Sequence, residues 1–196
     1  ILRGESQYCT STYMDNFVVE EMPATTVTQT TALSSGANWF SSYVEITLDD
    51  LKAALVATGN TEITIQGQTQ NTIYNPNNGR WTGQLRTLDL SKMYIIKVAD
   101  ACEITLEGMP VDPSMHPITI EPGVNWIAYP FNTSMTVTNA FAGFAVTNDK
   151  VQSQLQNANY NGTRWIGQLR NLEPGKGYIY NSASTGNRTF TFPLGN

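Results

Sequence analysis

The side chains best suited to chemistry in this sequence are amides and aromatic rings. Glutamine recurs at every second position in two predicted strands, and a tyrosine follows each row at a spacing that places it on the same face. Amides exchange hydrogen bonds with hydroxyls, and a flat ring can cover the C–H face of a sugar. The pattern is compatible with a carbohydrate-binding surface, but a solvated polar sheet face is the interpretation we favour. With two tryptophans added, the candidate ligand-binding residues are Gln66, Gln68, Gln70, Tyr74, Trp81, Gln152, Gln154, Gln156, Tyr160 and Trp165.

Four tryptophans occur as two matched pairs. Trp39 and Trp126 lie in apolar strands, where an indole is most often a core anchor, and we expect both in the core. Arg and Gly flank Trp81 and Trp165 near a turn. Such a position fits either close packing or a platform that is kept clear for a partner, so these two belong to the candidate binding set.

Catalytic and metal-binding motifs are not found in the sequence. It contains no G-x-S-x-G, H-E-x-x-H, P-loop or G-x-G-x-x-G pattern. The one histidine, His116, precedes Pro117, and we expect it to be a solvated linker residue. A glycosidase needs two carboxyl groups at a defined separation. The acidic candidates are Glu45, Asp49, Glu103 and Glu107, and no two of them recur as a pair in both halves of the sequence. The sequence therefore predicts no enzyme, no cofactor and no metal site.

Charged residues are sparse and evenly spread. The 196 residues include 11 Lys and Arg and 16 Asp and Glu, and charged residues make up 14% of the chain. Without a basic stripe, nucleic acid is not an expected partner. No apolar run approaches the roughly 18 residues of a membrane-spanning helix. A cation and an acid three residues apart occur twice, Arg86 with Asp89 and Arg170 with Glu173, and we expect surface ion pairs that fix a turn.

The sequence repeats itself at an offset of 84 to 87 residues. GANW at 36–39 recurs as GVNW at 123–126, and RWTGQLR at 80–86 recurs as RWIGQLR at 164–170. Lys92 and Tyr94 recur as Lys176 and Tyr178, and the small changes of offset place length differences in loops. This order of landmarks predicts two tandem copies of one module, which makes matched side chains occupy matched places.

The copies divide the chain into three parts. Residues 22–111 form the first copy and residues 112–196 the second, with a boundary near residues 111–114, where two prolines flank polar residues. Leu2 and Tyr8 have the spacing of Leu88 and Tyr94. We therefore expect residues 1–21 to be the terminal hairpin of a preceding repeat in a longer protein, in which this segment is a monomer.

Two motifs of the second copy resemble a tandem repeat of secreted and surface proteins of Bacteroidetes bacteria. That repeat combines a Gly-x-Asn-Trp opening, a Trp-x-Gly-x-Leu middle and a Pro-Gly-Lys-Gly-Tyr close, and WIGQL at 165–169 and PGKGY at 174–178 match it. The first copy departs from it, because Ser91 and Met93 stand where the glycine pair would be. The resemblance implies an extracellular or cell-surface location and carries no assigned activity.

Each copy is expected to contain several short strands and one short helix. In the first copy Thr47 is the predicted N-cap, Leu48, Leu51 and Leu55 form an apolar stripe, and Gly59 ends the helix. In the second, the expected cap is Ser134, and the stripe consists of Val137, Phe141 and Phe144. A final hairpin should close each copy, with strands 94–98 and 103–107 in the first and 178–181 and 188–192 in the second.

These elements predict a β-dominated α+β fold in two tandem, mostly antiparallel modules. Two roles from different classes remain open. One is a non-catalytic structural or display module of an exported surface protein, with an adhesive role toward a host or cell-surface protein. The other is a carbohydrate-binding module that takes a glycan. A Cys9–Cys102 disulfide and a pair of separate thiols are both compatible with the two cysteines.

Overall fold

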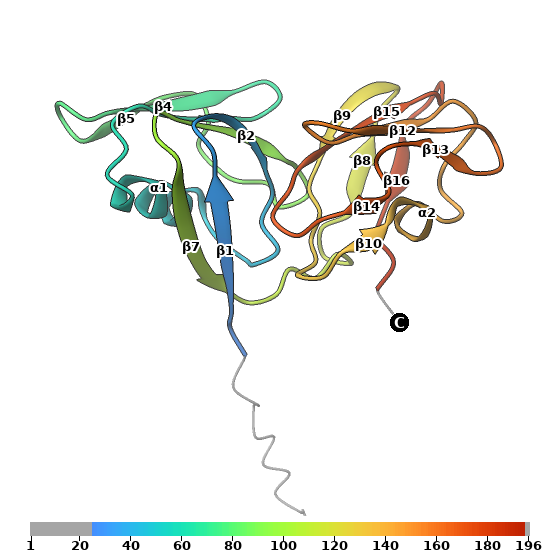
Figure 1. The fold of residues 1–196 in the computed structure, drawn as a ribbon, viewed down its shortest axis with the longest axis horizontal. Helices are drawn as coiled ribbons and strands as arrows, with labels where there is room; N and C mark the ends of the chain where they lie inside the picture. The colour runs from blue at the N-terminus through green and yellow to red at the C-terminus, as the bar shows by residue number, and fades with distance from the viewer. Residues whose placement is uncertain (1–24, 195–196) are drawn as a thin grey trace, which may run out of the picture.

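The structure, a computed structural model, describes residues 25–194 and is dominated by short antiparallel strands (Figure 1). We refer to residues 25–111 as the first half and to residues 112–194 as the second half. Each half contains one helix, α1 and α2 respectively. The strands of the first half are β1 (Val27–Leu33), β2 (Gly36–Phe40), β3 (Ile63–Gln66), β4 (Asn71–Asn75), β5 (Arg80–Gly83), β6 (Tyr94–Val98) and β7 (Cys102–Gly108).

Two sheets enclose the core of the first half. The larger sheet has the antiparallel order β2-β6-β3-β4-β5, and β1 pairs only with β7. Side chains alternate along these strands, so that Ile63 and Ile65 of β3 are buried while Gln66 is half-exposed. The core gathers apolar side chains from both sheets and from the helix, which packs beside β7 (Figure 1).

Helix α1 (Leu48–Ala57) begins and ends where the sequence predicts. The Thr47 hydroxyl accepts a hydrogen bond from the Asp50 amide at 3.2 Å, and the Asp50 carboxylate accepts one from the Thr47 amide at 2.8 Å. This capping box satisfies two amides at the helix N-terminus. Leu48, Leu51 and Leu55 are its buried side chains. Neither helix of residues 25–194 has the length and apolar character needed to cross a membrane.

The second half is built from shorter strands in the same arrangement. Its larger sheet has the order β9-β15-β11-β12-β13, which corresponds one for one to that of the first half. The outer strand β8 pairs with β16, as β1 pairs with β7, and β10 pairs with β14. The strands are β8 (Ile118–Ile120), β9 (Gly123–Ile127), β10 (Met135–Thr136), β11 (Lys150–Gln152), β12 (Asn157–Tyr160), β13 (Trp165–Gly167), β14 (Asn171–Leu172), β15 (Tyr178–Ser182) and β16 (Arg188–Phe190).

Two glycines of the shared RWxGQLR motif have the same unusual backbone. Gly83 has φ +142°, and Gly167 has φ +150°. A Cβ atom would lie 2.2 Å from the carbonyl oxygen of Asn71 at the first position and 2.2 Å from that of Asn157 at the second. Only glycine can bring the chain this close to the neighbouring strand, so the motif fixes the same close approach of two paired strands in each half.

The helix of the second half is shorter than predicted and begins at a different cap. Helix α2 spans only Val137–Ala140, and its N-cap is Thr136, whose hydroxyl accepts a hydrogen bond from the Asn139 amide at 3.2 Å. The prediction of Ser134 as cap is therefore wrong. Gly143 follows with φ +72°, and this left-handed residue ends the helical path after one turn. The predicted stripe residue Phe141 is nevertheless buried.

The predicted closing hairpins are also wrong. Strands β6 and β7 follow each other in sequence, but β6 lies between β2 and β3, whereas β7 crosses to pair with β1. In the second half β15 and β16 separate in the same way. Their proximity in sequence favoured a hairpin. Two sheets that pack on opposite sides of one core bury more apolar surface, and this favours placing consecutive strands in different sheets. The hairpin predicted for residues 1–21 lies outside the described residues, as does Cys9.

The segment between the halves is anchored to the first half, although several of its residues, such as Asp112, Ser114 and Met115, are exposed. The Val111 amide donates to the carbonyl of Tyr43 at 3.0 Å, and Val111 is buried. His116 was predicted to be a solvated linker residue, but its Nε2 lies 2.8 Å from the Glu45 carboxylate, 71 residues earlier in the chain. The connection therefore holds to the first half through backbone and side-chain contacts.

Candidate functional site

The glutamine rows do not form one strand face. Strand β3 ends at Gln66, because the Gly67 amide bonds the carbonyl of Gln70 at 2.8 Å and closes a tight turn. After β11, the Ser153 amide bonds the carbonyl of Gln156 at 2.8 Å and closes the equivalent turn. The prediction of three aligned amides per strand is therefore wrong, because a four-residue turn redirects the chain in each half.

The exposed turn glutamine of the first half caps the edge strand of the second. The Gln68 Nε2 donates to the carbonyl of Val124 at 3.1 Å, and its Oε1 accepts from the Trp126 amide at 3.2 Å. Strand β9 lies at the edge of its sheet, where unpaired peptide groups would otherwise face solvent. A glutamine amide can present an N–H donor and a C=O acceptor on the same side, as one residue of an extended strand does, so it takes the place of a residue of a neighbouring strand.

The turn glutamine of the second half returns the same contact. The Gln154 Nε2 donates to the carbonyl of Ala37 at 2.7 Å, and its Oε1 accepts from the Trp39 amide at 3.2 Å. These peptide groups belong to β2, the edge strand of the first half. The halves therefore meet through reciprocal contacts, in which each contributes one glutamine and one strand edge.

Backbone contacts add to this junction in the same reciprocal manner. The Ser41 amide donates to the carbonyl of Gly175 at 3.2 Å, and the Ala128 amide donates to that of Ser91 at 3.0 Å. Ser41 and Ala128 each follow an edge strand, and Ser91 and Gly175 each precede the strand next to an edge strand, β6 and β15 respectively. The two edges are thus held together over several residues, at the centre of the molecule.

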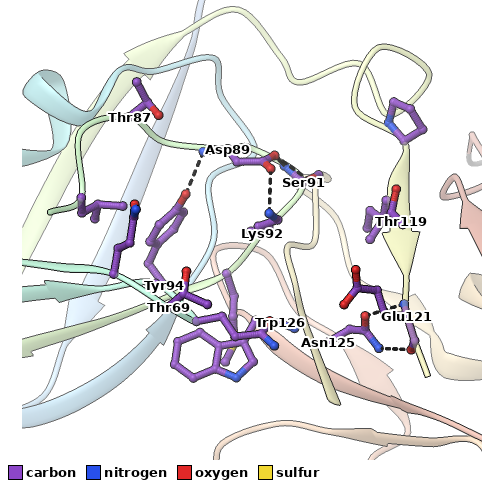
Figure 2. Close-up of a pocket in the computed structure, with 17 residues that line it drawn as sticks. Thr69, Thr87, Asp89, Ser91, Lys92, Tyr94, Thr119, Glu121, Asn125 and Trp126 are labelled. Atoms are coloured by element: carbon purple, nitrogen blue, oxygen red, sulfur yellow. Dashed lines mark hydrogen bonds and ion pairs between the residues drawn. The ribbon is translucent and has the colours of Figure 1, made fainter. Parts of the chain in front are cut away.

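A first groove lies on one side of the junction, with a volume of about 530 Å³ (Figure 2). Half-exposed Trp126 of the second half lines it together with residues of the first. Within it, Lys92 forms an ion pair with Asp89 at 3.4 Å, and the Asp89 amide donates to the Tyr94 hydroxyl at 2.7 Å. Burial raises the pKa of the Asp89 carboxyl. Hydrogen bonds from Ser91 and the nearby Lys92 ammonium together lower this pKa by more, so it lies below its ordinary value.

A second groove of about 620 Å³ lies between equivalent residues with the roles of the halves exchanged. Trp39 lines it from the first half, and Glu173 and Lys176 line it from the second. The Tyr178 hydroxyl accepts from the Glu173 amide at 2.6 Å, and burial raises the pKa of this tyrosine to about 12. The grooves contain four of the ten predicted binding residues: Gln68, Gln70, Gln154 and Gln156.

The predicted pairing of Arg86 with Asp89 is wrong. Asp89 instead pairs with Lys92, three residues in the other direction, because the intervening turn brings the Ser91 amide and the lysine onto one carboxylate. Arg170 lines the second groove, and no ion pair joins it to Glu173 among the described residues.

The tyrosines and tryptophans of the predicted set lie away from the glutamine turns. Tyr74 packs on Trp81 with ring centroids 5.3 Å apart, and Tyr160 packs on Trp165 at the same distance. Tyr74 stands at the far end of β4 from its turn, so the proposed glutamine–tyrosine face is not assembled. Trp165 is 8% exposed and belongs to the core of the second half.

The placement of Trp39 and Trp126 corrects another prediction. Both were expected in the core, yet both are half-exposed and line the grooves. In each strand the preceding asparagine takes the inward position: Asn38 is buried and bonds the amide and carbonyl of Ser34 at 2.9 and 2.7 Å. Alternation along the Gly-x-Asn-Trp strand therefore turns the indole outward, and this period of two was the signal available in the sequence.

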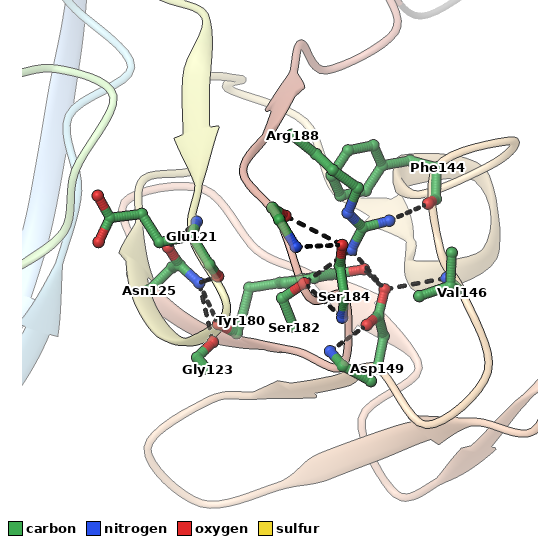
Figure 3. A network of polar contacts seen from close by, with 12 residues as sticks. Glu121, Gly123, Asn125, Phe144, Val146, Asp149, Tyr180, Ser182, Ser184 and Arg188 are labelled. Atoms are coloured by element: carbon green, nitrogen blue, oxygen red, sulfur yellow. Dashed lines mark hydrogen bonds and ion pairs between the residues drawn. The ribbon is translucent and has the colours of Figure 1, made fainter.

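A buried polar network in the second half escaped the sequence analysis (Figure 3). The fully buried Asp149 carboxylate accepts from the Tyr180 hydroxyl at 2.5 Å, from the amides of Ala183 and Val146 at 2.7 and 2.9 Å, and from Arg188 at 3.0 Å. Burial raises the pKa of this carboxyl. The four hydrogen-bond donors together lower the pKa by more than burial raises it, so it lies below its ordinary value.

The network joins elements of one half, and Asp149, Tyr180 and Arg188 line neither groove. The Arg188 guanidinium also donates to the carbonyl of Phe144 at 2.8 Å and lies 4.3 Å from the centre of its ring. Tyr180 pairs with Val151 as Ile96 pairs with Ile65 in the first half, so an apolar side chain occupies the matching place there. This difference assigns the network to holding the second half together.

Potential metal ligands do not gather anywhere in residues 25–194, where no three His, Cys, Asp or Glu side chains come together. The junction with its two grooves is therefore the candidate functional site. Comparison of the chain with family models, with curated proteins and with solved structures gave no match.

Proposed function

We propose that the chain is two tandem copies of one β module, which act as a non-catalytic structural or display unit of an exported surface protein. The observation that carries this proposal is the reciprocal glutamine contact. Gln68 and Gln154 use both the donor and the acceptor of their amides on the opposite strand edge. Side chains engaged in this way join modules, which suits a unit whose work is to hold a fixed shape.

The two-copy organisation has further support in matched detail. The larger sheets have the same strand order, and Gly83 and Gly167 make the same close approach. Asn125 bonds Glu121 as Asn38 bonds Ser34. Unrelated segments would have no physical reason to place a buried asparagine, and a glycine in close contact with the neighbouring strand, at the same points of the same topology.

The exported location rests on composition and resemblance. Charged residues are only 14% of the chain, and the 165–169 and 174–178 motifs resemble those of secreted Bacteroidetes repeats. A rigid unit of this kind would space or present other parts of a longer surface protein, including parts that adhere to a host or cell-surface protein.

The structural role is tested by replacing the two junction glutamines. Gln68→Ala with Gln154→Ala should increase the radius of gyration measured by X-ray scattering, because the halves lose their edge-to-edge contacts. The matched control is Gln66→Ala with Gln152→Ala, since these strand-end glutamines make no hydrogen bond across the junction within residues 25–194. A radius unchanged in the junction variant, or turnover of a glycan or ester by the wild-type chain, would contradict the proposal.

The second candidate function is carbohydrate binding, and the grooves favour it over the original glutamine–tyrosine face. Each groove sets a half-exposed tryptophan beside glutamine amides and an acid or a lysine. An indole can stack on a sugar ring while amides and charged groups bond its hydroxyls. Two equivalent grooves would bind two sugar units of one glycan or two glycans.

A glycan array separates the two candidates. Wild-type protein is compared with Trp39→Ala, Trp126→Ala and the double variant, and with Tyr74→Phe as a control remote from the grooves. A carbohydrate-binding module should lose most of its binding in the double variant, and each single variant should keep one site. No binding by the wild type would remove this candidate and leave the structural role in place.

A further inference from the structure

One pair of matched positions meets at the centre of the junction. Met93 and Gly177 directly precede β6 and β15, the strands next to the edge strands β2 and β9, and occupy the same place in the repeat. A Cβ atom on Gly177 would lie 2.4 Å from the Met93 Cβ and 2.9 Å from its sulfur. The reciprocal contacts therefore surround an approximate twofold axis that passes between these two residues.

Gly177 is required by space and not by backbone conformation. Its φ is not in the left-handed region, unlike that of Gly175 two residues earlier. Met93 is fully buried, and the carbonyl oxygen of Phe40 would be 3.0 Å from the added Cβ. Because the nearest atom is the Met93 Cβ, a rotamer change of the methionine cannot relieve the contact.

We propose that the junction is a closed pairing surface for two unlike copies, one with a large residue and one with glycine at the axis. Two copies of the first kind would set two methionines against each other, and two copies of the second would leave a void. This inference rests on the two-copy proposal and extends it.

The pairing also ends with two copies. An interface around a twofold axis uses the same surface on both partners, so it closes instead of propagating as a solenoid does. Both glutamines and both strand edges are already engaged within the chain. A longer protein with more copies would therefore assemble them two by two, each pair carrying its own pair of grooves.

The test is a set of substitutions in the full chain. Gly177→Ala should lower Tm by roughly 2–12 °C, since overpacking of a buried contact of this kind is costly, and should increase the radius of gyration in solution scattering. Met93→Gly in the same chain should restore the radius and most of the Tm loss, whereas Met93→Ala should not, because it keeps the Cβ. Gly186→Ala is the control, since nothing lies within 4 Å of its added Cβ.

Two results would overturn the inference. One is an equal effect of Gly177→Ala in the wild-type, Met93→Gly and Met93→Ala chains, which would mean that the two positions do not meet. The other is a concentration-dependent wild-type oligomer that dissociates on Gln68→Ala, which would mean that the surface is open to further copies. Either result would leave the two-copy organisation itself unaffected, because that depends on the fold of each half.

Discussion

Removal of the Asp149 carboxylate is the sharpest test of what stabilises the second half. The Asp149→Ala variant leaves the Tyr180 hydroxyl and the amides of Val146 and Ala183 without their acceptor. It also removes the counter-ion of Arg188, whose guanidinium keeps only neutral acceptors, the Phe144 carbonyl and the Ser182 hydroxyl. The carboxylate is fully buried, and Arg188 is 20% exposed. Water can therefore reach the guanidinium only in part, and it can reach the other three donors only if the structure opens.

The magnitude follows from that burial. Breaking a buried ion pair by removing one partner costs about 3–5 kcal/mol, because it leaves an uncompensated charge. The loss of three further hydrogen bonds places Asp149→Ala toward the upper part of this range. The double variant Asp149→Ala with Arg188→Ala removes the stranded charge, so it should be less destabilised than the sum of the two single variants.

Urea unfolding followed by circular dichroism measures these differences. Glu107→Ala is the control, since this carboxylate is exposed on β7 and should leave the transition midpoint unchanged. A cost below about 1 kcal/mol for Asp149→Ala would refute the reasoning, because an exposed surface ion pair already contributes up to that much to stability. Strict additivity in the double variant would refute the coupling between Asp149 and Arg188.

Three further predictions concern pH, the close approach of two strands at Gly167, and a helix cap. The folded pKa of Asp149 is lowered, so its stabilising contribution is complete above the unfolded value of about 3.9 and is lost as pH falls through the folded value; urea midpoints should decline more steeply with acidification in wild type than in Asp149→Ala. Gly167→Ala should cost about 1–3 kcal/mol in urea unfolding, because φ is +150° and the Cβ would strike a backbone carbonyl, whereas Gly186→Ala should be neutral. Thr47→Ala should cost about 1 kcal/mol in thermal unfolding and reduce the helical dichroism signal, because it removes the cap of α1; an unchanged Tm would contradict the capping role.

Local chemistry made part of the fold predictable. Thr47, Asp50 and the following leucine stripe define α1 within a few residues of sequence, and the structure has the helix in that place. In the second half the same reasoning chose Ser134, because three hydroxyl residues, Thr133, Ser134 and Thr136, lie close together and only geometry selects Thr136. Strand partners were less accessible, since whether β6 pairs with β7 or with β3 depends on contacts distant in sequence.

The site was harder to predict than the strands. Gln68 has the same neighbours in sequence whether it faces solvent, a sugar or another strand edge, and only the docking of the halves decides. Asp149 has no counterpart in the first half, where Ile63 stands at the matching position, so the repeat itself gave no indication of a buried charge. Comparing the copies finds what they share and misses what is particular to one of them.

What the copies share has its own physical meaning. The Gly-x-Asn-Trp motif places an asparagine inward, where it bonds the turn that precedes its strand, and leaves a tryptophan on the edge that faces the other half. The turn glutamine reaches that edge, and Met93 and Gly177, which directly precede Tyr94 and Tyr178, meet between the halves. Three landmarks separated by tens of residues in each copy thus converge on one surface. Under the two-copy proposal, folding a single module would not require this convergence, whereas pairing two modules would. We therefore interpret these landmarks as an assembly motif whose grooves form only when both halves are in place.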